Sequence, residues 1–193
     1  MLLSSWYEQE VVTAARGLLG KRLVRRMDGD RISGLIVETE AYRGEEDLAC
    51  HARTGRTSRT AVMYGPPGRA YIYFTYGMHW LLNVVCMPEG FPAAVLIRAI
   101  VPQEGLDRMA AKRVGRPEAH WTDGPAKLTQ ALVIDGCLNG VDLTDPFGDL
   151  WIEDAPPVTD SLIKVGPRVG IHSVPEPWKS IGWRFIYPFP TRI

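Results

Sequence analysis

Apolar and polar residues follow two different periods along this chain, and each period predicts a different kind of element. Residues 7–20, YEQEVVTAARGLLG, have apolar positions at helical spacing and end in a glycine, which is typical of a helix. Residues 21–42, KRLVRRMDGDRISGLIVETEAY, have the pattern of two strands joined by the hairpin signal Asp28-Gly29. We therefore expect a helix that leads into a β-hairpin.

The later segments predict a similar mixture of elements. Residues 68–87 are rich in aromatic and β-branched side chains and are interrupted at Gly77, which predicts a second hairpin. The remaining apolar segments predict a buried strand over residues 93–102 and helices over residues 104–115 and 123–134. Because strands and helices occur in separate runs, without βαβ alternation, the pattern favours an α+β fold.

Length and composition fit one domain over residues 1–193. The chain is 46% hydrophobic, enough for one substantial core, and no low-complexity linker divides it. Charges within the first twenty residues exclude a signal-peptide core, and no apolar run is long enough for a membrane span. The cysteines are odd in number and form no CxxC pair: Cys50, Cys86 and Cys137. We expect a soluble protein of the reducing cytoplasm, with no membrane partner.

The charge is balanced overall but uneven along the chain. Lysine and arginine number 22, as do aspartate and glutamate. Residues 52–69 contain four arginines and no acid, residues 164–193 contain five basic residues and one acid, and residues 134–160 contain seven acids and no lysine or arginine. A neutral sum can therefore hide one basic and one acidic face, and a phosphate backbone would bind only the basic one.

Two carboxylates in the second predicted strand are candidates for chemistry. Side chains alternate along a strand, so Glu38, Glu40 and Tyr42 share one face. One interpretation is a solvent-facing strand on which glutamates are simply hydrated. The other is a general base in a pocket, with His51 following eleven residues after Glu40. The pattern alone leaves both open.

The second hairpin has apolar residues where a turn is expected. Tyr71 and Tyr73 share one face, and core packing accounts for Ile72 and Phe74 on the other. The turn itself, Tyr76-Gly77-Met78, has no evident way to bury its side chains within its own domain. Proteins that separate base pairs insert apolar wedges of this kind, and a protein-binding tip accounts for the residues equally well.

Several segments together resemble the alkyladenine (3-methyladenine) DNA glycosylase family. The resemblance covers residues 14–187 and rests on IVETEAYRGEEDLACH, YIYFTYGMHWLLNVV, LIRAIVPQEGLDRM, GPAKLTQAL, RVGI and WRFIY, in that order. It implies a curved, largely antiparallel sheet flanked by helices, with a protruding β-hairpin that inserts into DNA. It also implies a monomeric enzyme, associated with the bacterial nucleoid through DNA, that removes alkylated or deaminated purines from double-stranded DNA without a metal or cofactor.

The resemblance assigns roles to individual residues. Glu40 matches the general base that activates the attacking water, with Glu38 as its neighbour. Hydrolysis of an N-glycosidic bond passes through a cationic sugar, so one carboxylate can both activate water and stabilise that charge. The residues that match the family's base pocket are Tyr42, Ala49, His51, Tyr73 and Asn83.

A second group of residues matches DNA contacts of the family. Tyr76 corresponds to the residue that fills the gap left by the flipped nucleotide, and Met78 lies beside it. The matching contacts to the DNA backbone are Arg56, Arg98 and Lys127. An ion pair of Arg98 with Glu38 or Glu40, or a solvated lysine at position 127, would account for those residues as well. At the exit of the second hairpin, His79 and Trp80 differ from the family pattern. This difference bears on how selectively the pocket recognises its base.

Three other functions remain open from the sequence. Glu40, Asp47 and His51 could hold a metal in a hydrolase, although no HExxH motif or second nearby histidine completes the set. A non-catalytic binder of damaged or structured nucleic acid could use the same hairpin and arginines. A bifunctional glycosylase-lyase requires an amine nucleophile, for which Lys127 is the candidate.

Overall fold

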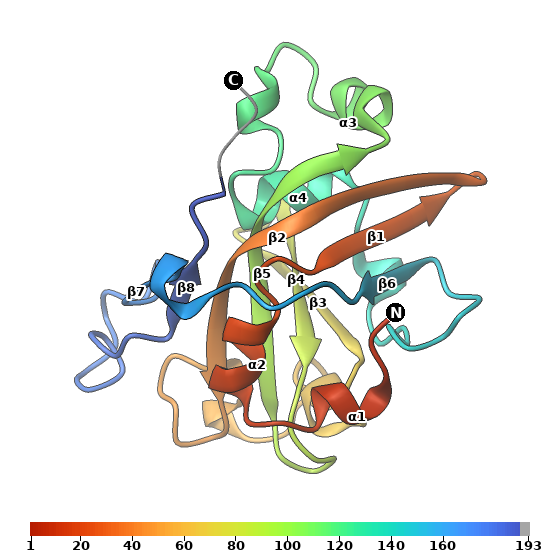
Figure 1. Ribbon diagram of the computed structural model, residues 1–193. Coiled ribbons are helices and arrows are strands. Elements are labelled where there is room, and N and C mark those ends of the chain that lie inside the picture. Colours follow the sequence, from red (N-terminus) through yellow and green to blue (C-terminus); the bar gives the residue numbers. More distant parts are fainter. Residues whose placement is uncertain (190–193) are drawn as a thin grey trace.

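A computed structural model describes residues 1–189 of the chain, and it has an open antiparallel sheet with short helices (Figure 1). The main sheet has the order β3-β4-β5-β2-β1-β6, and β8 pairs with both β2 and β7. The strands are β1 (Arg22–Met27), β2 (Asp30–Arg43), β3 (Ala70–Thr75), β4 (His79–Val85), β5 (Ala93–Glu104), β6 (Leu150–Glu153), β7 (Lys164–Gly166) and β8 (Arg184–Ile186). The α+β class expected from the pattern is confirmed.

The helices lie around the sheet in short pieces. They are α1 (Ser4–Tyr7), α2 (Val11–Gly17), α3 (Leu106–Lys112) and α4 (Pro125–Ala131), with 3-10 turns at His51–Thr54, Ala61–Tyr64, Glu118–His120, Gly136–Leu138 and Asp160–Leu162. Of the helix expected over residues 7–20, only α2 forms, and it begins at Val11 because the carboxylate of Glu10 caps its start. No helix within residues 1–189 is long and apolar enough to cross a membrane.

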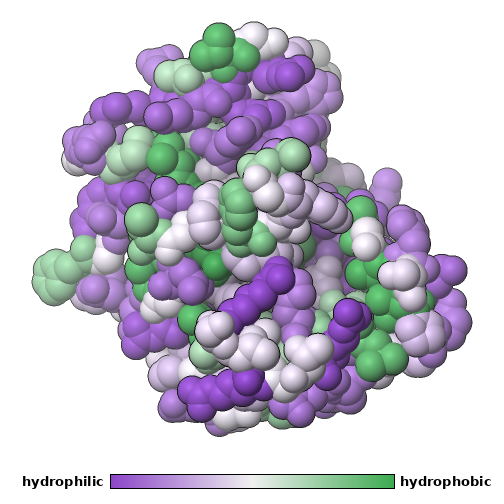
Figure 2. Space-filling view, turned by 180° about the vertical axis from the view of Figure 1, so that it is seen from behind, coloured by the Kyte–Doolittle hydropathy of each residue, from purple (hydrophilic) through white to green (hydrophobic). Residues whose placement is uncertain are grey.

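The two hairpins form where the sequence predicts them. Asp28 and Gly29 both have positive φ, 54° and 85°, in the two-residue turn between β1 and β2. In the second hairpin β3 pairs with β4 up to Thr75, and the turn carries Tyr76 and Met78 with 82% and 66% of their surfaces exposed. The hairpin lies behind β1 and β2 in Figure 1, and Figure 2 views the molecule from that side.

Phe74 is an exception to the expected packing of the second hairpin. Its side chain is 46% exposed, whereas Ile72 on the same strand face is buried in the core. Phe74 packs instead against Trp80, its partner across the strands, with ring centroids 4.8 Å apart. The expectation of a core position for Phe74 was wrong, because the end of the hairpin extends beyond the layer that covers Ile72.

An irregularity between β2 and β5 determines which β2 side chains reach the core. Val37 of β2 and Arg98 of β5 have no partner in the register, because the pairing shifts on both sides of Glu38. An extra residue in a strand changes the face on which the following side chains lie. Ile36 and Thr39, three residues apart, are therefore both fully buried. The carboxylates of β2 are turned away from this core.

Candidate active site

Glu40 is the centre of the candidate site and is fully buried. Its Oε1 accepts the backbone N–H of Val169 at 2.7 Å and lies 3.3 Å from the Arg98 guanidinium. Its Oε2 accepts the hydroxyl of Tyr42 at 2.8 Å. The interpretation of Glu40 as a hydrated strand residue was therefore wrong, and the carboxylate belongs to an enclosed polar cluster.

Burial is the main influence on the protonation of Glu40. Loss of solvent raises its pKa above the usual range, and the nearby carboxylate of Glu38 acts in the same direction. The Arg98 charge, the Val169 N–H and the Tyr42 hydroxyl oppose this effect by stabilising the anion. A carboxylate whose pKa is raised toward neutral pH suits a general base.

Glu38 has a different environment on the same strand. Its Oε1 accepts from Nε of Arg98 at 2.8 Å and from Nε of Arg184 at 2.6 Å. The ion pair expected between Arg98 and one of the two glutamates is thus found with both. Glu38 is occupied by two cations, which suits a supporting role.

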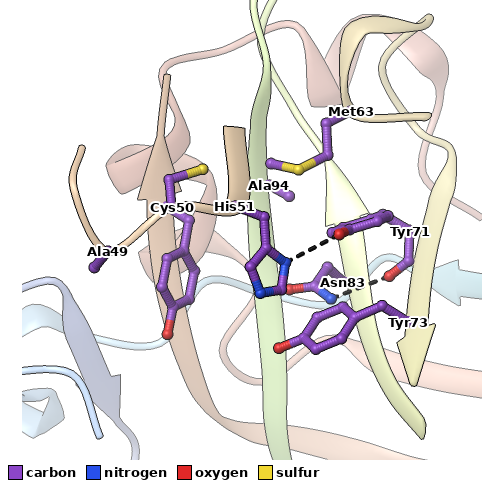
Figure 3. Close-up of a pocket in the computed structure, with 9 residues that line it drawn as sticks. Ala49, Cys50, His51, Met63, Tyr71, Tyr73, Asn83 and Ala94 are labelled. Carbon is purple, nitrogen blue, oxygen red and sulfur yellow. Dashed lines mark hydrogen bonds between the residues drawn. The ribbon is translucent and has the colours of Figure 1, made fainter. Parts of the chain in front are cut away.

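Aromatic rings form a narrow pocket beside Glu40 (Figure 3). The predicted pocket residues Tyr42, Ala49, His51, Tyr73 and Asn83 all line it, together with Cys50, Met63, Tyr71 and Ala94. The His51 and Tyr73 rings meet edge to face, with centroids 4.5 Å apart. The cavity measures about 30 Å³, room for a water molecule.

Hydrogen bonds fix the orientation of the pocket side chains. Nδ1 of His51 lies 3.0 Å from the hydroxyl of Tyr71, and Nε2 lies 3.3 Å from Nη2 of Arg59. Burial and the charges of Arg59 and Arg53 lower the pKa of His51 to about 4. The imidazole is therefore neutral near pH 7, and because Arg59 donates to Nε2, Nδ1 carries the proton and donates to Tyr71.

Asn83 is held firmly in the pocket wall. It is 4% exposed, and its Nδ2 donates to the backbone carbonyl of Tyr71 at 3.0 Å. Tyr71 pairs with Asn83 across β3 and β4. The amide group therefore has a fixed position in the pocket wall.

A wider cleft outside this pocket connects it to the hairpin. Tyr73 and Tyr76 line it from β3 and the hairpin turn, Arg98 from β5, and Val169 from the segment before β8. Further cleft residues are Arg53, Thr54, Thr57, Arg59 and Thr60. The structure thus brings the exposed tip, several cations and the surroundings of Glu40 together along one surface.

The three residues expected to contact the DNA backbone differ in whether their charges are already paired within the protein. Arg56 has no ion-pair partner within the described residues and lies near the Tyr64 ring. Lys127 donates to Asp123 at 2.8 Å and is absent from the lining of the pocket and cleft. Arg98, as a partner of both glutamates, lies at the base of the cleft.

The basic residues of segment 164–193 differ in how far they are engaged within the fold. Arg168 is buried in an ion pair with Asp47, and Arg184 binds Glu38. These two side chains are engaged within the fold, whereas Lys164 and Lys179 of the same group are exposed. Arg192, another member of that group, lies outside the described residues.

Two further residues of the site were not assigned from the sequence. Val169 contributes its backbone N–H, which no side-chain pattern reveals, although it lies within the RVGI segment. Tyr71 shares a strand face with Tyr73, and this alternation was a usable signal for a second pocket tyrosine.

The other candidate chemistries find little support in this geometry. Both carboxylate oxygens of Asp47 are occupied by Arg168, and both ring nitrogens of His51 have partners. Glu40, Asp47 and His51 therefore do not converge as metal ligands. Residues 1–189 contain no group of three or more histidine, cysteine, aspartate or glutamate side chains that could hold a metal ion. Lys127, the amine considered for lyase chemistry, is held by Asp123 away from the pocket.

Comparison with known proteins identifies the family of this chain. A family model described as methylpurine-DNA glycosylase matches residues 5–189. Similar proteins, provisionally named 3-methyladenine DNA glycosylases, occur in Chlorobaculum parvum, with 46% identity over 91% of this chain and 84% of the relative, and in Carboxydothermus hydrogenoformans, with 46% identity over 96% and 94%. A relative with the same name in Methanocella arvoryzae is 44% identical over 93% and 90%.

These similarities define the class of the protein. The protein is a DNA glycosylase, a hydrolase that acts on N-glycosidic bonds. Within that class, the chain belongs to the methylpurine-DNA glycosylase family.

Proposed function

We propose that this glycosylase removes alkylated or deaminated purines, of the 3-methyladenine, hypoxanthine and ethenoadenine type, from double-stranded DNA and leaves an abasic site. The observation that carries the proposal is the position of Glu40, a fully buried carboxylate beside a pocket of aromatic rings. Aromatic walls suit a base that has been rotated out of the duplex.

Glu40 would act as the general base. An ionised carboxylate offers about four lone-pair positions. Val169 donates to one position of Oε1, beside the Arg98 guanidinium, and Tyr42 donates to one position of Oε2, so a second position on Oε2 is left for the attacking water. Glu40 accepts a proton from this water as the water oxygen bonds to C1′ of the sugar. The bond from C1′ to the purine nitrogen breaks, and its electron pair leaves with the base.

The pocket walls would select and hold the base. Tyr42 and Tyr73 supply ring faces and edges, and neutral His51 is fixed by Tyr71 and Arg59. A 3-methyladenine base already carries positive charge and leaves readily, whereas hypoxanthine needs a proton or hydrogen bonds on the purine. Asn83, fixed in the wall, would exclude guanine by crowding its exocyclic amine.

The hairpin would keep the flipped nucleotide out of the duplex. Tyr76 and Met78 are exposed at its tip, and Tyr76 also lines the cleft that leads to the pocket. An apolar wedge between base steps offsets part of the cost of unstacking. The proposal needs no metal, cofactor or second protein chain.

Base release from defined duplexes tests this function. The purified protein is incubated with duplexes that carry hypoxanthine, ethenoadenine or 3-methyladenine, and alkali then cleaves the abasic sites. We expect release of at least one base by the wild type, retained with a chelator present. Binding of damaged duplex without release of any base would favour the non-catalytic binder and overturn the proposal.

A further inference from the structure

A buried ion pair lies next to the candidate site and has no role in the chemistry described so far. Arg168 and Asp47 both have fully buried side chains, with Nη1–Oδ2 and Nη2–Oδ1 distances of 2.5 and 2.8 Å. This two-pronged pair joins the loop after β2 to the segment between β7 and β8.

Asp47 organises the loop that leads into the pocket. Its carboxylate accepts the backbone N–H of Arg43 at 3.1 Å and that of Ala49 at 3.0 Å, in addition to the Arg168 guanidinium. Arg43 is the last residue of β2, and Ala49 lines the pocket. Asp47 therefore sets the path of the chain from the strand that carries Glu40 to the pocket wall.

Arg168 organises the opposite side of the same site. Its Nη1 donates to the backbone carbonyl of Ala41 at 2.9 Å, and its guanidinium lies 4.7 Å from the centre of the Tyr42 ring. The next residue, Val169, donates its N–H to Glu40. Arg168 thus holds two groups, Val169 and Tyr42, that bind separate oxygens of the Glu40 carboxylate.

The pair is a poor device for stability alone. Burying two charges costs several kcal/mol for each ion, and well-packed apolar residues in place of such a pair often leave stability equal or higher. In addition, Nε of Arg168 is buried without a hydrogen-bond partner among the described residues. A precise function for the guanidinium explains its presence better than a general contribution to folding.

We propose that Arg168, held by Asp47, is a positioning residue that places the Val169 N–H and the Tyr42 hydroxyl on Glu40, and so keeps this carboxylate oriented for water activation. The inference rests on the proposed function. Arg168 would contact neither the DNA nor the reacting atoms.

The pH dependence of the rate separates positioning from general stability. Glu40 faces Arg98 from β5, Glu38 and Tyr42 from its own strand, and Val169 from the segment before β8. The Val169 and Tyr42 hydrogen bonds stabilise the anion, so their displacement should raise the pKa of Glu40 further. The acidic limb of the pH–rate profile should then move to higher pH.

The test uses single-turnover base release by Arg168→Lys, which keeps the charge but loses the two-pronged contact. We expect the rate to fall by roughly tenfold or more, with the acidic limb at higher pH and lesion-DNA binding nearly unchanged. Asp47→Asn should act in the same direction. Lys21→Met is the matched control, because Lys21 is another buried cation paired with an acid, Asp154 at 2.6 Å, and is not a contact of Glu40.

A double variant guards against loss of folding. Asp47→Asn/Arg168→Met removes both charges of the buried pair, and the amide oxygen at position 47 can still accept a backbone N–H of the loop. This variant should remain folded, and its rate of base release should stay below that of the wild type. Wild-type rate and pH limb in this variant, or an effect of Arg168→Lys no larger than that of Lys21→Met, would overturn the inference. Failure of the wild type to release any base would instead overturn the proposed function.

Discussion

Glu38 and Glu40 both form an ion pair with the guanidinium of Arg98. Glu40 is the more deeply buried of the two, and each glutamate has different additional partners. Glu38 is also paired with Arg184, while the additional partners of Glu40 are the uncharged Tyr42 hydroxyl and Val169 N–H. Two carboxylates two residues apart thereby have different surroundings, which fits the proposed tasks of an ion-pair anchor for Glu38 and a general base for Glu40.

The first prediction separates these two tasks. Glu40→Gln keeps the shape of the side chain but cannot accept the proton of water, so base release should fall by roughly 10²-fold or more while binding of damaged DNA persists. Glu38→Gln should cost much less. Single-turnover release and duplex binding measure both effects; equal losses in the two variants would argue against Glu40 as the base.

The second prediction concerns stability and pH. The fold raises the pKa of Glu40, so it favours the neutral carboxyl, and that contribution is present at low pH and lost as pH rises through the folded-state pKa. Glu40→Gln removes the cost of the buried anion. The Tm of this variant should therefore exceed that of the wild type at about pH 8, and the difference should shrink on acidification. An equal or lower Tm at the higher pH would contradict the account of Glu40 burial.

The third prediction concerns the origin of the acidic limb of activity. Since the pKa of His51 is lowered to about 4, the imidazole stays neutral through the range in which Glu40 is expected to ionise. His51→Gln should reduce the rate through weaker pocket contacts but leave the limb where it is. A limb that disappears in this variant would assign the titration to His51.

The sequence predicted the elements that depend on local signals. Asp28-Gly29 marks a turn that needs two positive φ angles, and the buried strand around Arg98 is continuously apolar on both sides of it. The bulge at Val37 could not be predicted, because it arises from the pairing with β5. The same limit applies to Arg168, which resembles a surface arginine until the fold brings Asp47 to it from 121 residues away.

The fourth prediction concerns salt. If the cations around the cleft bind phosphates, affinity for duplex DNA should fall steeply with salt concentration, because each neutralised phosphate releases counterions. Arg56→Gln should reduce the salt slope by about one, without changing which base is removed. Lys127→Gln, at a lysine already paired with Asp123, should change it less. A wild-type slope near zero would contradict a DNA partner.

The last prediction concerns Tyr76, whose side chain is 82% exposed and has a backbone φ of 50° in the hairpin turn. An aromatic residue in this position gains little from its own domain. Extracting a purine from a duplex costs a few kcal/mol of pairing and stacking, and a wedge in the vacated space would offset part of that cost by blocking the return of the base. The side chain should matter most where the base is hardest to extract.

Tyr76→Ser should therefore leave the fold intact and slow excision strongly when the damaged purine is well paired. The loss should be smaller when the same lesion is mispaired or unpaired, since there the unstacking has largely occurred before the enzyme binds. Phe74→Ser is a useful comparison, because this exposed aromatic residue of the same hairpin packs against Trp80 and is not part of the cleft. Equal losses on both substrates for Tyr76→Ser would indicate a general DNA contact, and a lower Tm would show that the ring supports the hairpin itself.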